Sequence, residues 1–110
     1  GDQERDFIFI DDVVTAYLTV LEKSPGLTNF IEFDVGTGQL LSVKSFLQNL
    51  KKIYEDSFGL SNTKLDFGAI PYRDGEMMTV EINNHKLLDL GWYPRTKLEC
   101  GLTKTIKGNI

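Results

Sequence analysis

A helical pattern near the start of the chain limits the folds that are open to it. Apolar residues recur at helical spacing from Val13 to Leu21, and Ala16 and Val20 widen the stripe until the predicted helix is apolar almost all round. Such a helix has to be covered on more than one side, because apolar surface left in water is unfavourable. We therefore expect a larger neighbour to pack on this end of the chain. The alternative is that the chain's own later helices cover it.

The segments on either side of this helix define its ends. Residues 7–10, Phe-Ile-Phe-Ile, form a continuous apolar run that is typical of a buried strand or extended segment. Either Asp11 or Asp12 is predicted to cap the helix by accepting hydrogen bonds from its first N–H groups. Residues 24–26, Ser-Pro-Gly, are expected to break it.

Strands and helices are mixed along the rest of the chain. Residues 30–35 alternate as a strand, and Ser42 is the expected N-cap of an amphipathic helix whose apolar stripe runs from Val43 to Tyr54. The other expected elements are short strands at 65–67 and 78–82, an ordered turn at 71–76, a helix capped by Asn83 or Asn84 and ended by Gly91, and a last helix opened by a capping box from Thr96 to Glu99. The pattern predicts an α/β or α+β fold, with residues 1–110 as a single domain or fragment.

Composition excludes several classes of function. The chain has 110 residues and a net charge of −4 with scattered cations, which argues against nucleic acid as a partner. No apolar run reaches the roughly 18–20 residues of a membrane span. The acidic start does not resemble a signal peptide, and the single Cys100 fits a reducing compartment, so we expect a cytoplasmic protein. With only His85 beside that cysteine, no metal site is expected.

Two patterns resemble parts of a redox enzyme but are incomplete. Residues 36–38, Gly-Thr-Gly, look like half of a dinucleotide fingerprint, but Leu41 occupies the position of the third glycine. We interpret the glycines as a turn between a strand and a helix. Tyr93 and Lys97 have the spacing of a catalytic Tyr-x-x-x-Lys pair, but Pro94 between them breaks the required helix. We therefore expect no catalytic residue and no cofactor site in this chain.

The arginines are few and well placed. Arg5 precedes the apolar run at 7–10, and Arg73 lies in a turn that also contains Glu76. Two arginines at the ends of ordered segments can converge on a diphosphate, and the carboxylate of Glu76 can accept hydrogen bonds from ribose hydroxyls. The alternative is that both arginines form local ion pairs with Asp6 and Asp74.

Five segments, in the same order over nearly the whole chain, resemble the motifs of extended short-chain dehydrogenases, the NAD-dependent nucleotide-sugar epimerases and dehydratases. They are residues 5–13 (R-D-F-I-F-I-D-D-V), 33–38 (F-D-V-G-T-G), 73–76 (R-D-G-E), 90–94 (L-G-W-Y-P) and 98–102 (L-E-C-G-L). Asp34 stands where the family usually has asparagine, and Cys100 where it usually has an acidic residue. Residues 65–73 resemble the corresponding segment of the family's enzymes that make CDP- or dTDP-deoxysugars, which include 4-ketoreductases.

The resemblance implies roles for particular residues. Arg5 and Arg73 would contact the diphosphate of a nucleotide-activated sugar, Glu76 would hold the ribose, and Asp12 would be structural. The family's N-terminal Rossmann domain, with its glycine-rich loop and Tyr-x-x-x-Lys pair, has no counterpart here. The chain is thus expected to be the C-terminal, substrate-binding part of an enzyme that uses NAD or NADP, binding no cofactor and no metal itself.

Two other functions remain open from the sequence. The first is a stand-alone nucleotide-binding module. The second is a structural fragment that forms a homodimer through its exposed apolar surface.

Overall fold

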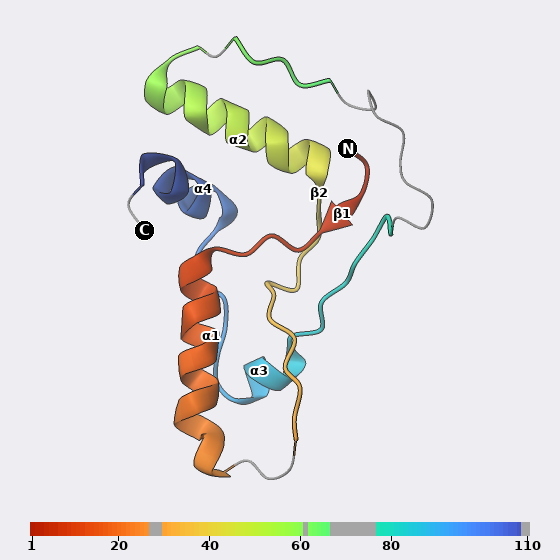
Figure 1. The fold of residues 1–110 in the computed structure, drawn as a ribbon, viewed down its shortest axis with the longest axis vertical. Helices are drawn as coiled ribbons and strands as arrows, with labels where there is room; N and C mark the ends of the chain where they lie inside the picture. Colours follow the sequence, from red (N-terminus) through yellow and green to blue (C-terminus); the bar gives the residue numbers. More distant parts are fainter. Residues whose placement is uncertain (27–29, 61, 67–76, 109–110) are drawn as a thin grey trace.

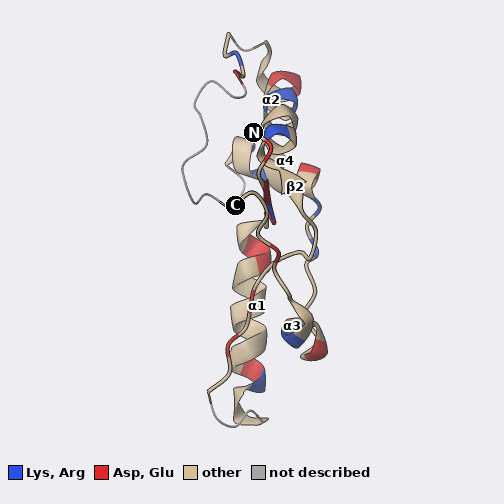
Figure 2. Cartoon of the chain, turned by 90° about the vertical axis from the view of Figure 1, so that its right-hand side faces the viewer, with Lys and Arg blue, Asp and Glu red and all other residues tan. Residues whose placement is uncertain are grey.

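The molecule is a thin plate about one helix thick. A computed structural model describes residues 1–26, 30–60, 62–66 and 77–108. The plate measures 52 × 37 × 15 Å, and its narrow dimension is seen in the side view of Figure 2. The Cα radius of gyration is 16.9 Å, whereas a compact domain of this length has about 13 Å. A plate this thin cannot enclose a large core, so its helices keep exposed faces.

Four α-helices and two short strands are found within the described residues (Figure 1). In chain order they are β1 (Glu4–Arg5), α1 (Ile10–Lys23), a 3₁₀ turn (Ser24–Gly26), β2 (Leu41–Ser42), α2 (Val43–Phe58), α3 (His85–Asp89) and α4 (Leu98–Lys107). The strands pair antiparallel, with Glu4 opposite Ser42 and Arg5 opposite Leu41. This mixture of helix and strand confirms the predicted fold class.

Helix α1 begins earlier than its sequence pattern indicates. Ile10 is already helical and half exposed, so the prediction of a buried strand or extended segment through residue 10 is wrong at its end. The N-cap is Phe9, whose side chain cannot cap, so neither Asp11 nor Asp12 has the predicted capping role. Both lie in the first turn, where a carboxylate is favoured by the helix dipole. The 3₁₀ turn at 24–26 confirms the predicted break.

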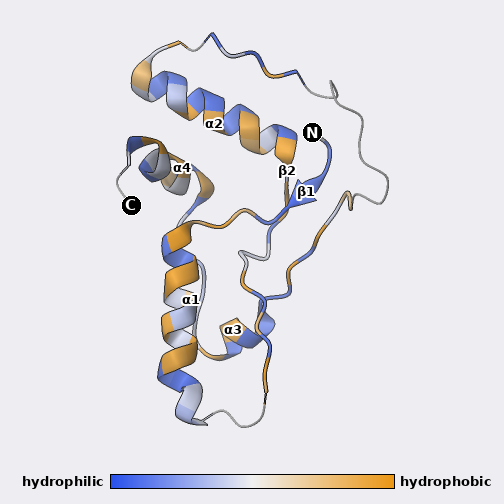
Figure 3. Ribbon diagram, in the orientation of Figure 1, coloured by the Kyte–Doolittle hydropathy of each residue, from blue (hydrophilic) through white to orange (hydrophobic). Residues whose placement is uncertain are grey.

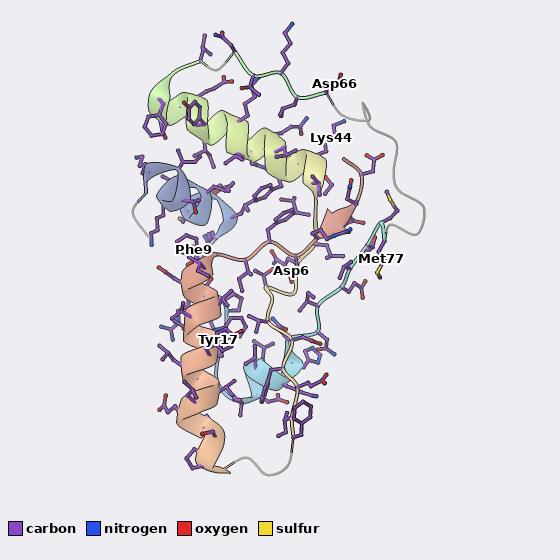
Figure 4. All side chains as sticks on the ribbon, in the orientation of Figure 1. Asp6, Phe9, Tyr17, Lys44, Asp66 and Met77 are labelled. Atoms are coloured by element: carbon purple, nitrogen blue, oxygen red, sulfur yellow. The ribbon has the colours of Figure 1, made fainter. Side chains whose placement is uncertain are left out.

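Most of the apolar surface of α1 is not covered by the rest of the described chain. Ala16 is buried, but five large apolar side chains along the helix are about half to two-thirds exposed: Ile10, Val14, Tyr17, Leu18 and Leu21. Figure 3 shows apolar residues along this helix, and Figure 4 labels Tyr17 on it. The alternative that later helices of the chain cover α1 on all sides is therefore wrong for the described residues.

Two small clusters hold the plate together. In the lower cluster, beside α1 and α3 in Figure 1, Ala16, Leu87 and Trp92 are buried. Half-buried apolar residues pack against them: Ile8, Val20, Phe33 and Val35. In the upper one, α2 packs against α4, and the ring of Phe7 stacks on that of Phe46 with centroids 4.0 Å apart. The linker between β1 and α1 thus joins both clusters, because Ile8 belongs to one and Phe7 to the other.

Helix α2 agrees best with its predicted pattern. The hydroxyl of Ser42 accepts a hydrogen bond from the N–H of Ser45 at 3.1 Å, as expected of an N-cap. Gly91, with φ of 98°, follows α3 and confirms the expected left-handed residue at that helix end.

The predicted cap of α3 is confirmed through Asn83, whereas the predicted cap of α4 is wrong, because a longer-range contact engages Thr96. Asn84 is the N-cap of α3, but its side chain donates to the main-chain oxygen of Gly36. Asn83 instead accepts from the N–H of His85 at 3.0 Å. At α4 the N-cap is Lys97, and Thr96 is hydrogen-bonded to Asp12.

The predicted strands are largely unpaired within the described residues. Residues 30–35 keep the predicted alternation, with Phe33 and Val35 turned toward the core, but no strand is assigned there. Residues 65–66 also form no strand, and Phe67 lies outside the described residues. In the predicted strand at 78–82, only Thr79 forms a bridge, parallel to Glu4. The predicted turn at 71–76 lies outside the described residues.

Candidate functional site

Strand β1 is the junction at which three distant segments meet. On one edge it pairs with β2. On the other, the N–H of Glu4 donates to the main-chain oxygen of Met78, and the N–H of Val80 donates to that of Glu4 at 3.4 Å. The hydroxyl of Thr79 donates to the Glu4 carboxylate at 3.4 Å. The start of the chain is therefore fixed between residues 41–42 and 78–80.

Arg5 extends from this junction onto the neighbouring main chain. Its Nη2 donates to the main-chain oxygen of Met77 at 2.7 Å, and Nη1 donates to those of Glu4 at 2.7 Å and Met78 at 3.4 Å. Three of the five N–H donors of the guanidinium are engaged in this way. Figure 4 shows Met77 next to β1. Met77 follows Glu76 directly in the sequence.

The carboxylate of Asp6 points into the turn formed by residues 36–38, Gly-Thr-Gly, which we call the glycine turn. It accepts hydrogen bonds from the N–H groups of Thr37 and Gly38 at 2.9 and 2.8 Å, and from the Thr37 hydroxyl at 2.6 Å. The predicted local ion pair between Arg5 and Asp6 is therefore wrong, because the two side chains bind different segments. Asp6 instead shapes the turn.

Two N–H groups of the glycine turn are engaged within the chain. A dinucleotide loop binds phosphate with free backbone N–H groups, and two of those in this turn already donate to Asp6. Gly36 is packed so closely that a Cβ there would lie 2.7 Å from both an Asp6 oxygen and Ile82 Cγ2. Gly38 has φ of 81°, as expected for a turn glycine.

A second polar cluster ties α1 to the segment before α4. The buried Asp12 accepts from the N–H of Thr96 at 3.0 Å through its carboxylate, and its main-chain oxygen accepts from Trp92 Nε1 at 3.2 Å. The indole N–H is also 3.0 Å from the hydroxyl of Thr15. These contacts agree with the structural role that the family resemblance implies for Asp12.

The structure tests the predicted site residues unequally. It places Arg5 at the β1 junction, whereas Arg73 and Glu76 lie outside the described residues. His85 and Cys100 are exposed, and among the described ranges no three metal-ligating side chains come together. None of the helices in these ranges has the length and apolar character that a membrane span requires.

Sequence reasoning missed the functions of two side chains. The sequence pattern indicates Asp6 only as an ion-pair partner of Arg5, and Asn84 only as a helix cap. Asn84 is 7% exposed, and its Nδ2 donates to Gly36 O at 2.9 Å across 48 positions of sequence. No local sequence pattern predicts such a contact. A buried asparagine next to a glycine turn is, however, the kind of residue that forms hydrogen bonds to main-chain groups.

Comparison with known proteins gives consistent matches. Residues 1–36 match the sequence model of the NAD dependent epimerase/dehydratase family. The CDP-abequose synthase of Salmonella typhimurium is 41% identical over 107 residues, which are 97% of this chain and 35% of that protein. The dTDP-L-rhamnose 4-epimerase of Burkholderia thailandensis is 31% identical over 103 residues, 93% of this chain and 26% of that protein.

Solved structures show the same relationship in the fold. A UDP-glucose-4-epimerase from Stenotrophomonas maltophila aligns with a TM-score of 0.70 and 26% identity, over 97% of this chain and 31% of that one. The RMD protein of Pseudomonas aeruginosa, solved with NADPH, aligns with a TM-score of 0.69 and 21% identity, over 99% of this chain and 34% of that one.

The fold is thus a mixed helix–strand segment of an extended short-chain dehydrogenase. Together with the sequence matches, it shows that the chain belongs to the NAD-dependent epimerase/dehydratase family. The chain spans about a third of the length of the two CDP-abequose synthases that it matches.

Proposed function

We propose that this chain is the C-terminal, nucleotide-sugar-binding part of an NAD(P)-dependent epimerase, dehydratase or 4-ketoreductase, and that it is not catalytic alone. The observation that carries the proposal is the hydrogen bond from Arg5 to Met77, whose residues are 72 positions apart. It brings the R-D-F-I segment next to the residue that directly follows the R-D-G-E segment. These are the two motifs to which the family resemblance assigns substrate contacts.

The proposed contacts follow from the chemistry of the three side chains. Arg5 has two N–H groups beyond the three that donate to main-chain oxygens, and we propose that these reach the substrate diphosphate. Arg73 is proposed to hold the same diphosphate, and Glu76 to accept hydrogen bonds from the ribose. The similarity to a CDP-abequose synthase and to a dTDP-L-rhamnose 4-epimerase favours a CDP- or dTDP-linked deoxysugar as the substrate class.

We propose that a Rossmann domain in the rest of the parent protein binds NAD or NADP and supplies the catalytic tyrosine and lysine. The length of the relatives supports this, since this chain covers only 35% of the CDP-abequose synthase. The exposed apolar side of α1 and the unpaired segment at 30–35 are the surfaces that such a domain would cover. In that arrangement the bound nicotinamide supplies the hydride chemistry, while this chain orients the substrate.

Replacing Arg73 by alanine is expected to weaken nucleotide binding by about 1.5–3 kcal/mol, the contribution of a hydrogen bond to a charged group. Calorimetric titration of the chain with CDP, UDP, dTDP and GDP would measure this effect and name the preferred base. Arg95→Ala is the matched control, because the Arg95 guanidinium lies over the ring of Tyr93, in the segment before α4. Equal affinity in the Arg73 variant and the wild type would contradict the proposed site.

A titration in which the chain alone binds no nucleotide requires a second experiment. If the chain alone binds no nucleotide at millimolar concentration, the same variants are compared in the full-length protein. Binding there that is lost on Arg73→Ala would support the proposal and show that the site needs both parts. Binding that is unaffected by Arg73→Ala would refute the assignment.

Self-association is the structural alternative, favoured by the exposed apolar residues of α1. Light scattering at several protein concentrations distinguishes it from the proposal. A monomer at every concentration would count against a dimerising fragment.

A further inference from the structure

The main chain at residues 77–80 is held against β1 by two kinds of contact. Main-chain hydrogen bonds join Glu4 to Met78 and Val80 in a short parallel bridge. The side chain of Arg5 adds donors to two successive oxygens of the same segment, at 2.7 Å for Met77 and 3.4 Å for Met78. The bridge is only one residue pair long, and the Thr79 hydroxyl adds one side-chain hydrogen bond to Glu4, so the guanidinium supplies two of the three side-chain hydrogen bonds that join the described part of this segment to β1.

A planar guanidinium suits this task better than any other side chain. Its donors form a rigid fork that can engage adjacent acceptors at once, whereas lysine offers a compact ammonium on a flexible stem. Arg5 is itself half-buried and paired with Leu41 in the β1–β2 ribbon, which orients its stem. The fork is therefore aimed by a strand rather than by a flexible loop.

We infer that Arg5 is a positioning residue, which fixes the main chain of Met77 and Met78 and thereby the end of the segment that carries the substrate contacts. This inference rests on the proposed function and extends it. Met77 directly follows the R-D-G-E motif in the sequence, so the Arg5 fork holds the first two residues after that motif. Loss of Arg5 then acts on nucleotide binding through the motif, besides any phosphate contact of its own.

Hydrogen exchange of the ligand-free protein tests the fork directly. We expect Arg5→Ala to speed amide exchange at residues 77–80 by about ten-fold or more, as for loss of one hydrogen bond from a charged donor. Arg5→Lys is expected to do nearly the same, because one ammonium does not replace the fork. Arg95→Ala should leave exchange there unchanged, and circular dichroism checks that all variants are folded. Wild-type exchange at 77–80 in Arg5→Ala would overturn the inference.

A double-mutant cycle in the nucleotide titration separates positioning from simple structural support. If Arg5 acts through the motif, the effects of Arg5→Ala and Arg73→Ala on affinity are not independent. The loss of affinity in the double variant is then smaller, by at least roughly three-fold, than the product of the losses in the two single variants. Multiplicative losses would show that Arg5 binds independently and would overturn the positioning role. Wild-type affinity in Arg73→Ala alone would contradict the proposed function instead, and the exchange experiment would still decide whether Arg5 fixes residues 77–78.

Discussion

Replacing Trp92 by alanine is expected to lower the free energy of unfolding by about 3–5 kcal/mol, the range for removing a buried aromatic side chain. Trp92 is 4% exposed and packs with Ala16 and Leu87 in the lower cluster. Its indole N–H also contacts oxygens of Asp12 and Thr15.

Two further variants separate the contributions of volume and hydrogen bonding. Trp92→Phe keeps much of the ring but removes the N–H, so we expect a loss of about 1–3 kcal/mol. Tyr93→Ala, at an adjacent aromatic that is 55% exposed, should change stability by no more than about 0.5 kcal/mol. Urea unfolding followed by circular dichroism measures all three, because the only tryptophan is lost in two of them. Equal losses for Trp92→Ala and Trp92→Phe would contradict the packing argument.

The second large effect is expected from Gly36→Ala, at about 2–4 kcal/mol, as the sum of two costs. The new Cβ would lie 2.7 Å from an Asp6 oxygen and from Ile82 Cγ2, and 3.0 Å from Ile82 Cβ. Overpacking of this kind costs about 1–3 kcal/mol. Displacing the Asp6 carboxylate also weakens its hydrogen bonds to Thr37 and Gly38, which adds to the cost.

The contribution of the Ile82 contact to the cost of Gly36→Ala can be tested by shortening the Ile82 side chain. In an Ile82→Ala background, which removes the Cγ2 contact, Gly36→Ala is expected to cost less by at least about 0.5 kcal/mol. Gly26→Ala is the matched control, because a Cβ at Gly26 meets nothing within 4 Å. Urea unfolding followed by the fluorescence of Trp92 measures each variant. A cost of Gly36→Ala that is independent of Ile82 would show that contact with this side chain is not its cause.

Short-range signals in the sequence are sufficient for some elements. The cap and stripe of α2 and the left-handed Gly91 after α3 agree with the prediction, because such contacts lie within about one helical turn. The surplus apolar surface of α1 is also evident from the sequence, since composition around a helix does not depend on its neighbours. The five family motifs locate Arg5, Arg73 and Glu76, because motif order can be read along the chain alone.

Long-range contacts explain why Thr96 and Asn84 do not cap their helices as predicted. Thr96 has the residue type and spacing of a capping box, yet its N–H and hydroxyl go to Asp12, 84 positions away. Asn84 likewise leaves its helix for Gly36. A buried carboxylate or main-chain oxygen without a partner costs more free energy than an uncapped helix end, which water can solvate. The distant acceptor therefore determines where the side chain points.

The family, the order of the helices and the residues proposed to bind substrate follow from the amino-acid sequence, because they depend on local pattern and motif order. The contacts of those residues depend on the tertiary structure. Asp6 and Arg5 are adjacent in sequence, yet Asp6 binds the turn at 37–38 and Arg5 the main chain at 77–78. Successive side chains of an extended segment point to opposite sides, so two neighbours in sequence serve two segments that are far apart along the chain.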